Sequence, residues 1–552
     1  MNGAEFIVRI LIKSGSRTVF GYPGGTVLSL YDSLYRHRSE IRHVRTSHEQ
    51  GSAHAADGFA RMSGKPGVCI ATSGPGATNL VTGIANAFMD SVPVIFITGN
   101  VEHSLIGTDS FQEVDIVGMT LGITKHSWAV RSPDMLIDAM TSAERICMTG
   151  RRGPVLVDVA KDVLDCDSPD YTDALEMFEP FSQTETACGA KTETAPDEEE
   201  ISGVLGLIAE SKKPLVICGG GVRQAGAGEE LIEFARSAGA PVCQTLMGIG
   251  TLEPDEPLNL GLMGAMAGKA AKKALNECDL IIAVGARLGN KVADISGLVS
   301  GGKKLVQIDA DRAEINKIVK ADAYIASDAK MALRGILARS GGIAGRKPWL
   351  TRDSFAENVS GVQKHDLKKG FVDPEDIFAA VKKGAGNSLT VASDVGLHQL
   401  YTASHFPLGP ADRFISSGGL GTMGFGIGAS IGAKIAGPER TTVLFAGDGG
   451  FMMSMNELAT VAAEKLPLII IVMRNGELGM VREMQRKYCG RRYSQTKLGL
   501  KVNIPRLCSS FGIDGVRART AVEIEQAVKD AVCENRAVVI EVRTVLRGAE
   551  ND

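Results

Sequence analysis

The chain has 552 residues, of which 44% are hydrophobic and 22% are charged, and its formal net charge is −4. The length predicts two to four domains of roughly 150 residues each, and the composition is ordinary for a soluble globular protein. The small negative charge gives no reason to expect binding to nucleic acid or to a membrane surface. We recognise no secretory signal peptide and no apolar run near the ~20 residues of a membrane span, so we expect a cytoplasmic protein. The ten cysteines include no Cys-x-x-Cys pair, which indicates reduced core residues and not a disulfide framework or a metal site.

The chain repeats one local pattern, in which a short strand rich in valine and isoleucine leads through a glycine-rich turn into a helix. The clearest strands of this kind are at 67–72, 215–218 and 442–445. Alternating strands and helices predict an α/β fold built from doubly wound parallel sheets. Ligands of such sheets bind beyond the carboxyl ends of the strands, which is where these glycine turns lie.

Two polar stretches, at 182–200 and 341–347, have the composition of linkers between domains. They divide the chain into three parts, and each part contains the same strand, turn and helix pattern. We therefore predict an N-terminal domain at 1–182, a central Rossmann-like domain at 190–340 and a C-terminal domain at 365–552.

The first candidate site residue is Glu49, in the segment Thr46-Ser47-His48-Glu49-Gln50-Gly51. This segment follows a strand-like stretch at 41–44 and begins a helix rich in small residues. A glutamate at such a position is ordinarily an exposed residue in the first turn of a helix. The functional alternative is a buried carboxylate that shares a proton with a ring nitrogen of a heterocyclic cofactor. Glu49 alone does not decide between these interpretations.

Three further polar residues follow predicted strands. Lys161 has the charge to bind a substrate carboxylate, although an exposed lysine is common at a strand end. His398 could donate a hydrogen bond to a diphosphate, and a role as a helix cap is nearly as well supported. Arg287 could bind a ligand or could simply mark the end of the strand before it.

The segment Gly419-Leu420-Gly421-Thr422-Met423-Gly424 fits the dinucleotide-binding pattern Gly-x-Gly-x-x-Gly. Binding of NAD would also need an acidic residue at the end of the next strand, but the acid there, Asp448, lies inside a Gly-Asp-Gly turn. We therefore interpret this segment as a close turn beside another cofactor, with Met423 as an apolar support. An NAD-dependent oxidoreductase is the less favoured alternative.

The strongest pattern joins Asp448, in Gly447-Asp448-Gly449-Gly450, to Asn475, which follows the apolar run at 466–473. An acid and an amide at the ends of two parallel strands can converge at one edge of a sheet. Their oxygen atoms suit Mg²⁺, which takes its other ligands from water and phosphate. This spacing is the signature of thiamine diphosphate binding. The plain alternative, two unrelated turn residues, does not account for the helix and the buried strand between them.

With these residues assembled, the chain resembles the large catalytic subunit of acetolactate (acetohydroxyacid) synthase over nearly its whole length. The motifs that carry the resemblance lie at 20–25, 48–51, 71–80, 106–113, 417–426 and 478–482. The resemblance implies an enzyme that decarboxylates a 2-oxo acid such as pyruvate and adds the acyl unit to a second 2-oxo acid, giving acetolactate or a related acetohydroxy acid. A 2-oxo acid decarboxylase, an aldehyde carboligase, an acyl-CoA lyase and a non-catalytic homologue are the alternatives on the same scaffold.

The resemblance also implies the roles of individual residues. Glu49 would activate the cofactor, and Mg²⁺ would be held by Asp448, Asn475 and the carbonyl group of Glu477. The reaction pocket would be lined by Phe111, Gln112, Lys161 and Gly25. Further cofactor contacts are implied for Val395, Gly396, His398, Gly421, Met423, Gly449 and Gly450.

Two more features are implied, an FAD site without a redox role and an active site shared between subunits. The FAD site would include Gly219, Gly220, Gly221, Thr245, Arg287 and Asp309. Because Glu49 would come from one subunit and Asp448 from the other, the resemblance implies a homodimer or homotetramer, to which a small regulatory subunit can bind. The chain departs from the family pattern at Ala265, Lys291, Leu397 and Met484.

Overall fold

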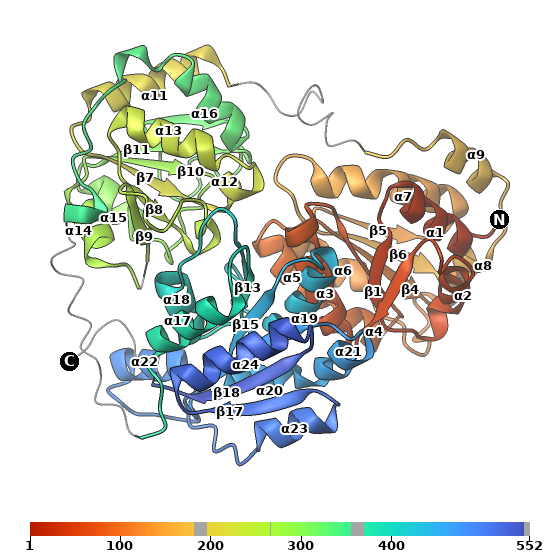
Figure 1. The fold of residues 1–552 in the computed structure, drawn as a ribbon. Helices are drawn as coiled ribbons and strands as arrows, with labels where there is room; N and C mark the ends of the chain where they lie inside the picture. Colours follow the sequence, from red (N-terminus) through yellow and green to blue (C-terminus); the bar gives the residue numbers. More distant parts are fainter. Residues whose placement is uncertain (182–195, 265, 355–368, 546–552) are drawn as a thin grey trace. The chain divides into compact units, whose positions relative to one another are not determined.

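The computed structural model describes residues 1–181, 196–264, 266–354 and 369–545 (Figure 1). Most of the predicted linker at 182–200 and the departure at Ala265 therefore lie outside the described residues. Three six-stranded parallel sheets with interleaved helices confirm the predicted α/β fold. The chain forms two units, one made of 1–185, 380–398 and 415–544 and the other of 186–379, 399–414 and 545–552. The predicted domain limits stay a prediction.

The first sheet has the strand order β2-β1-β3-β4-β6-β5. Its strands are β1 (Thr18–Gly21), β2 (Arg42–Arg45), β3 (Gly67–Ala71), β4 (Val94–Asn100), β5 (His126–Val130) and β6 (Val155–Ala160). The helices of this part are α1 (Gly3–Lys13), α2 (Leu28–Arg36), α3 (Glu49–Ser63), α4 (Pro75–Thr78), α5 (Val81–Met89), α6 (Ile116–Thr120), α7 (Pro133–Met148), α8 (Lys161–Asp165) and α9 (Asp170–Met177).

The central sheet has the order β12-β11-β10-β7-β8-β9. Its strands are β7 (Pro214–Cys218), β8 (Val242–Gln244), β9 (Asn259–Leu262), β10 (Leu280–Val284), β11 (Lys304–Asp309) and β12 (Ala323–Ala326). The helices are α11 (Glu198–Glu210), α12 (Gly220–Gln224), α13 (Gly228–Ala238), α14 (Lys269–Glu277), α15 (Ile295–Ser300) and α16 (Ala329–Leu337).

The third sheet has the order β14-β13-β15-β16-β18-β17. Its strands are β13 (Thr390–Ser393), β14 (Arg413–Ser416), β15 (Thr442–Gly447), β16 (Leu468–Arg474), β17 (Asp514–Ala518) and β18 (Val538–Arg543). The helices are α17 (Pro374–Ala385), α18 (Leu397–His405), α19 (Phe425–Ala436), α20 (Asp448–Ser454), α21 (Leu458–Ala463), α22 (Gly479–Tyr488), α23 (Ile504–Ser510) and α24 (Ala521–Cys533).

The central strands of the sheets are buried and mostly apolar because helices cover both of their faces. Every residue of β3, β4 and β6 is buried, and so is β16 up to Met473. This explains why the sequence shows continuous apolar runs at these strands and no alternation. Among the described residues, no helix is both long and apolar enough to cross a membrane.

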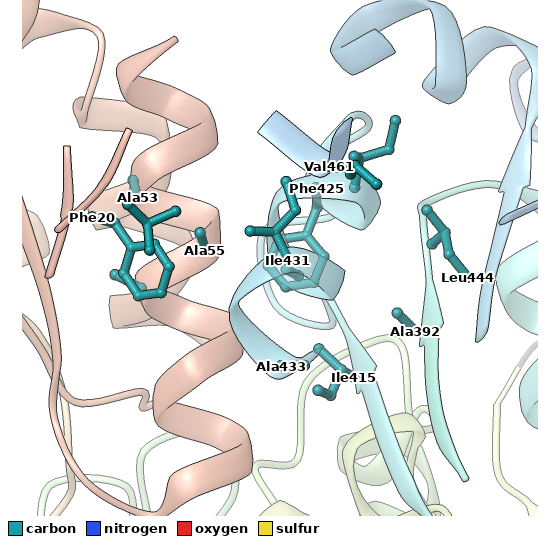
Figure 2. Packing of buried hydrophobic residues seen from close by; sticks show 14 of the residues in the cluster. Phe20, Ala53, Ala55, Ala392, Ile415, Phe425, Ile431, Ala433, Leu444 and Val461 are labelled. Carbon is teal, nitrogen blue, oxygen red and sulfur yellow. The ribbon is translucent and has the colours of Figure 1, made fainter. Parts of the chain in front are cut away.

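Helices α3 and α19 lie in close backbone contact within the first unit, and glycines make this possible. A Cβ atom on Gly432 would overlap the carbonyl oxygen of Ala55, and one on Gly58 would overlap that of Ala429. Figure 2 shows the same packing, with Ala55 and its neighbours on α3 beside residues of α19. This contact joins the helix that begins with Glu49 to the helix that follows the loop at 417–424.

We expect Gly432→Ala to destabilise the first unit because the added methyl group cannot fit without moving a backbone. Overpacking of this kind typically costs about 1–3 kcal/mol. Gly206→Ala is the matched control, because it also places alanine inside a helix (α11) but in open space, where the change should be neutral or slightly stabilising. Calorimetry of the two variants measures the difference. Equal melting profiles would contradict the close contact of α3 with α19.

Candidate active site

The third sheet brings most of the predicted cofactor residues to one edge. Strands β14, β13, β15 and β16 are neighbours in that order. Because parallel neighbouring strands end at the same edge, the loops that follow them lie side by side. The segments after these four strands carry Gly421 and Met423, then Val395 and Gly396, then Asp448, Gly449 and Gly450 at the start of α20, and then Asn475 and Glu477.

Asp448 is a buried carboxylate at the start of α20, directly after β15. Its Oδ2 accepts a hydrogen bond from the N–H of Gly476 at 2.8 Å, and its Oδ1 accepts one from Gly449 at 3.2 Å. No cationic side chain in the described part of the chain forms an ion pair with it. Burial raises the pKa of Asp448 above its ordinary value, and the backbone N–H groups and the charge of Arg474 lower it only in part. A bound cation would stabilise this carboxylate.

Asn475 follows β16, whose residues pair with β15 so that Met473 lies opposite Gly447. The expected convergence of the acid and the amide is therefore observed. The Oδ1 atom of Asn475 accepts a hydrogen bond from the N–H of Glu477 at 3.0 Å. The side chain of Glu477 pairs with Arg482 at 3.1 Å, and the implied role of its backbone carbonyl group as a metal ligand stays a prediction.

No group of three or more His, Cys, Asp or Glu side chains in the described ranges could hold a metal ion. A metal at this edge would therefore have to combine one carboxylate with amide and carbonyl oxygens, and complete its shell with water or phosphate. That donor set is the one that Mg²⁺ accepts. The residues present fit the ion, while their role as ligands stays a prediction.

The structure gives His398 a contact that differs from the predicted donation to a diphosphate. Its Nε2 atom accepts a hydrogen bond from the N–H of Gly447 at 3.2 Å. Burial lowers the pKa of His398 to about 4, so the ring is neutral at physiological pH. With Nε2 as an acceptor, the ring proton belongs on Nδ1. In this arrangement His398 holds the glycine turn that leads into Asp448.

The sequence reasoning overlooked Asp394, which follows β13 and is fully buried. Its carboxylate accepts hydrogen bonds from the N–H groups of Val395 at 2.6 Å, Gly424 at 3.0 Å and Gly426 at 3.3 Å. Burial nevertheless raises its pKa to about 6. Asp394 thereby ties two of the cofactor loops together at the N-terminus of α19. Its position as a polar residue at the end of a predicted buried strand could have identified it.

The first sheet places Glu49 at the N-terminus of α3, directly after β2. Its Oε2 atom accepts a hydrogen bond from the side-chain amide of Asn79 at 3.0 Å. Glu49 is partly exposed and not fully buried, because it lies where the strand ends and the sheet edge opens. Asn79 belongs to the sequence motif at 71–80, and its contact with Glu49 is a result of the fold.

Gln112 lies against the same loop as Glu49, the turn that follows β3 at 72–76, and the two neighbours of Gly25 contact this turn. A Cβ atom on Gly74 would come within 2.8 Å of that of Gln112, and one on Gly76 within 3.5 Å of Oε1 of Glu49. Gln112 has a φ of +61°, which is uncommon for a residue other than glycine. Beside Gly25, the hydroxyl group of Thr26 accepts a hydrogen bond from the N–H of Ser73 at 3.1 Å.

The hydroxyl group of Ser73 in this loop is buried and has no hydrogen-bond partner among the described residues. Such an orphaned polar atom is costly unless a ligand or water satisfies it. The N–H group of the same residue donates to Thr26. A polar ligand at this sheet edge would satisfy the hydroxyl group.

Lys161 and Phe111 are less closely tied to this cluster. Lys161 follows β6, and its ammonium group pairs with Asp165 at 3.0 Å and with Glu102 at 3.8 Å. Phe111 is 85% exposed, beside a loop in which Glu113 accepts a hydrogen bond from the N–H of Ser110. The predicted pocket roles of both residues stay predictions.

Glu457 connects the two sheet edges and was also overlooked. Its buried carboxylate accepts hydrogen bonds from the N–H of Ser47 at 3.1 Å and from the hydroxyl group of Thr460 at 2.7 Å. It thereby stabilises the segment that leads into Glu49. No sequence signal distinguishes it from an ordinary surface glutamate. Glu49 and Asp448 themselves share no hydrogen bond in the described part of the chain.

The central sheet places its predicted ligand residues after the neighbouring strands β7, β10 and β11. The N–H groups of Gly219 and Gly221 donate to the carbonyl oxygens of Val284 and Gly285, at 2.9 and 3.0 Å. These glycines therefore serve the close packing of two turns. Arg287 follows the second of these turns, and the carboxylate of Asp309 accepts a hydrogen bond from the N–H of Asp311 at 2.9 Å.

The departures from the family pattern lie in different surroundings. Leu397 is buried next to Gly479, where a Cβ atom would come within 2.8 Å of its side chain. Met484 lies on α22 and is 46% exposed. Lys291 is exposed in the central domain. Their effect on substrate choice stays a prediction.

Comparison with known families and proteins identifies the chain. It matches the N-terminal TPP binding domain, the central domain and the C-terminal TPP binding domain of thiamine pyrophosphate enzymes, over residues 1–119, 201–336 and 394–542. It is 40% identical to the probable acetolactate synthase large subunit of Methanocaldococcus jannaschii, covering 98% of this chain and 92% of the relative. It is 39% identical to the acetolactate synthase isozyme 2 large subunit of Escherichia coli K12, covering 96% and 93%. The chain belongs to the thiamine pyrophosphate enzymes and, within them, to the family of acetolactate synthase large subunits.

Proposed function

We propose that this protein is a thiamine diphosphate-dependent enzyme that decarboxylates pyruvate and joins the acyl unit to a second 2-oxo acid, forming acetolactate or a related acetohydroxy acid. The observation that carries the proposal is Asp448, a buried carboxylate without an ion-pair partner among the described residues, beside Asn475, in a chain related over its full length to acetolactate synthase large subunits. Glu49 with its amide donor, Asn79, supplies the second half of the site.

At the third sheet edge, Asp448, Asn475 and the carbonyl group of Glu477 would hold Mg²⁺. The glycine turn at 447–450 and the loops carrying Gly396 and Gly421 would surround the diphosphate. The N–H groups of Gly447 and Gly449 already donate to His398 and Asp448, so the N-terminus of α20 would favour the anion through its dipole. His398 would keep the turn in place through Gly447.

Bound thiamine diphosphate supplies a carbon nucleophile and a cationic ring that accepts the electrons released when carbon dioxide leaves. Glu49 would hold a proton between its carboxylate and a ring nitrogen of the cofactor, and Asn79 would orient that carboxylate. Gln112, held beside Gly74, and Lys161 would bind the 2-oxo acid. The loops around Ser73 and Phe111 would exclude water from the reacting carbonyl group.

We further propose that the active site forms between two copies of this chain, so that the enzyme is at least a homodimer. Glu49 and Asp448 lie at the edges of two different sheets and share no hydrogen bond in the described ranges. The strongly exposed Phe111 lies two residues before Glu113 on the loop that would face the second copy. A small regulatory subunit is an additional proposed partner.

We propose FAD binding in the central domain separately. Of the three glycines of its implied site, Gly219 and Gly221 donate their N–H groups to Val284 and Gly285. Arg287 and Asp309 follow adjacent strands and could still bind its polar groups. An absorption spectrum of the purified protein tests the proposal, because bound flavin absorbs visible light.

Product analysis tests the proposed reaction. Purified protein with thiamine diphosphate and Mg²⁺ should convert pyruvate to acetolactate, and with added 2-oxobutyrate it should also form the acetohydroxybutyrate product. Free aldehyde without acetolactate would identify a 2-oxo acid decarboxylase. A product that appears only with an added aldehyde would identify an aldehyde carboligase, and one that appears only with coenzyme A would identify an acyl-CoA lyase.

A further inference from the structure

A buried cluster of charged residues lies beneath the loop at 417–422, away from the atoms that would touch the cofactor. The side chain of Arg61, on α3, is 10% exposed, and its Nε atom pairs with Asp57 at 2.5 Å. Its Nη2 atom pairs with Asp90 at 2.9 Å, and its Nη1 atom donates to the carbonyl oxygen of Ser416 at 3.1 Å. Both carboxylates are buried. One guanidinium group therefore joins two helices to the end of β14.

The second carboxylate of the cluster holds the loop directly. The two oxygens of Asp90 accept hydrogen bonds from the N–H groups of Gly418 and Gly419, at 2.9 and 2.7 Å. Asp90 lies at the C-terminal end of α5, where the helix dipole disfavours a negative charge. The contacts with Arg61 and with the loop offset this cost.

A neutral branch of the network continues along the same loop. Asn86 donates from its side-chain amide to Asp57 at 3.0 Å and accepts a hydrogen bond from the hydroxyl group of Ser417 at 2.5 Å. The same hydroxyl group accepts hydrogen bonds from the N–H groups of Gly421 and Thr422, at 3.0 and 2.9 Å. The loop is thus held at several points before it reaches Met423.

The charges in the cluster do not balance, because two carboxylates share one guanidinium group. The remaining negative charge is stabilised by N–H groups of the loop and by Asn86. A buried network of this kind is stable only when every member keeps its partners. Displacement of the loop would leave Asp90 without two of its donors, so the network favours one loop position.

We propose that Arg61, Asp57 and Asp90 are positioning residues that set the loop at 417–423 for thiamine diphosphate binding and tie it to the helix that begins with Glu49. The inference rests on the proposed function, since Gly421 and Met423 contact the cofactor only if thiamine diphosphate binds at this edge. Helix α3 carries Glu49 at its first turn and Arg61 at its last. One helix thereby positions both the proton-holding carboxylate and the loop, which in the proposed homodimer would belong to two different active sites.

Two substitutions test the proposal. Asp90→Asn keeps the shape of the side chain but removes the charge and one acceptor, and Arg61→Lys cannot span Asp57, Asp90 and Ser416 with a single ammonium group. Each should weaken the binding of thiamine diphosphate, in the presence of excess Mg²⁺, by roughly 10- to 100-fold, the range typical for residues behind the direct ligands of a site. Arg236→Lys is the control, because Arg236 forms an exposed pair with Glu256 at 2.7 Å and should leave affinity unchanged.

Hydrogen–deuterium exchange of the protein without cofactor provides a readout that a general loss of stability would not imitate. Peptides from 417–424 should exchange faster in both variants, while those of β15 and β16 should keep their wild-type rates. If Arg61→Lys does not fold, Asp90→Asn and Ser417→Ala carry the test, since Ser417→Ala removes the acceptor for Gly421 and Thr422.

The outcomes separate this inference from the proposed function. Wild-type protein that binds thiamine diphosphate, together with folded variants that bind it equally well and keep the wild-type exchange of 417–424, would overturn the positioning role alone. Wild-type protein that does not bind thiamine diphosphate would overturn the proposed function and the cofactor role of this loop with it.

Discussion

Glu49→Gln should retain thiamine diphosphate binding but lose most of its turnover. The amide has the shape of the carboxylate and can still accept a hydrogen bond from Asn79, so the local structure should survive. It cannot hold the proton that a ring nitrogen of the cofactor would share with Glu49. Loss of a positioned proton-transfer group typically lowers the rate by about 10²- to 10⁴-fold. Steady-state turnover of pyruvate at saturating cofactor measures the effect.

Glu229→Gln is the matched control for this prediction. Glu229 also lies in the first turn of a helix, α13, and has no proposed role in the site. This variant should keep wild-type turnover and affinity. Near-normal turnover of Glu49→Gln would contradict the role of Glu49. Loss of cofactor affinity without loss of the maximal rate would assign it to binding only.

Asp448→Asn should abolish Mg²⁺-dependent binding of thiamine diphosphate. The substitution removes the one carboxylate of the proposed metal site and leaves only neutral oxygens from Asn475 and Glu477. Without ligands, the variant should melt within a few degrees of the wild type, because the new amide oxygen can keep the hydrogen bond with Gly476 and the buried charge is gone. Added Mg²⁺ and thiamine diphosphate should raise the melting temperature of the wild type only.

The same argument predicts a pH dependence. The metal requires ionised Asp448, and burial raises the pKa of this group. Protonation therefore competes with Mg²⁺, and the affinity should fall as the pH decreases towards that raised pKa. Calorimetric titration with Mg²⁺ at several pH values measures this change in affinity.

Asp328→Asn is the control for Asp448→Asn. Asp328 caps α16, and its carboxylate accepts hydrogen bonds from the N–H groups of Lys330 and Met331. Asparagine caps helices about as well as aspartate, so ligand-induced stabilisation should be unchanged. Binding of Mg²⁺ and thiamine diphosphate by Asp448→Asn with wild-type affinity would rule out this aspartate as a ligand.

The sequence was informative about features that depend on where a residue lies along a strand. Alternating strands and helices led to the three parallel sheets, and the Asp448 and Asn475 pattern led to one sheet edge. Both inferences need only local information, since neighbouring parallel strands end at the same edge whatever the rest of the chain does. The family resemblance rests on the same short motifs.

The contacts that support those motifs could not be predicted in the same way. The sequence did not predict that His398 accepts a hydrogen bond from Gly447, while its contact with a diphosphate stays a prediction. The spacing of Asp57 and Arg61 is that of an ordinary surface pair on a helix, yet Asp57 is buried and Arg61 is only 10% exposed, and the pair connects to Asp90 and to the loop at 417–422. The sequence does not distinguish Glu457 from other helical glutamates, yet its carboxylate stabilises the segment before Glu49.

The sequence by itself determined the α/β fold and the positions of the motifs at strand ends. Only the tertiary structure decided which side chains meet behind them, such as Arg61 with Ser416 or Ser47 with Glu457. The physical reason is that burial and hydrogen bonding between segments hundreds of residues apart depend on how helices α3 and α19 pack. Their glycines allow the close approach, but no local pattern of residues says which helix packs against which.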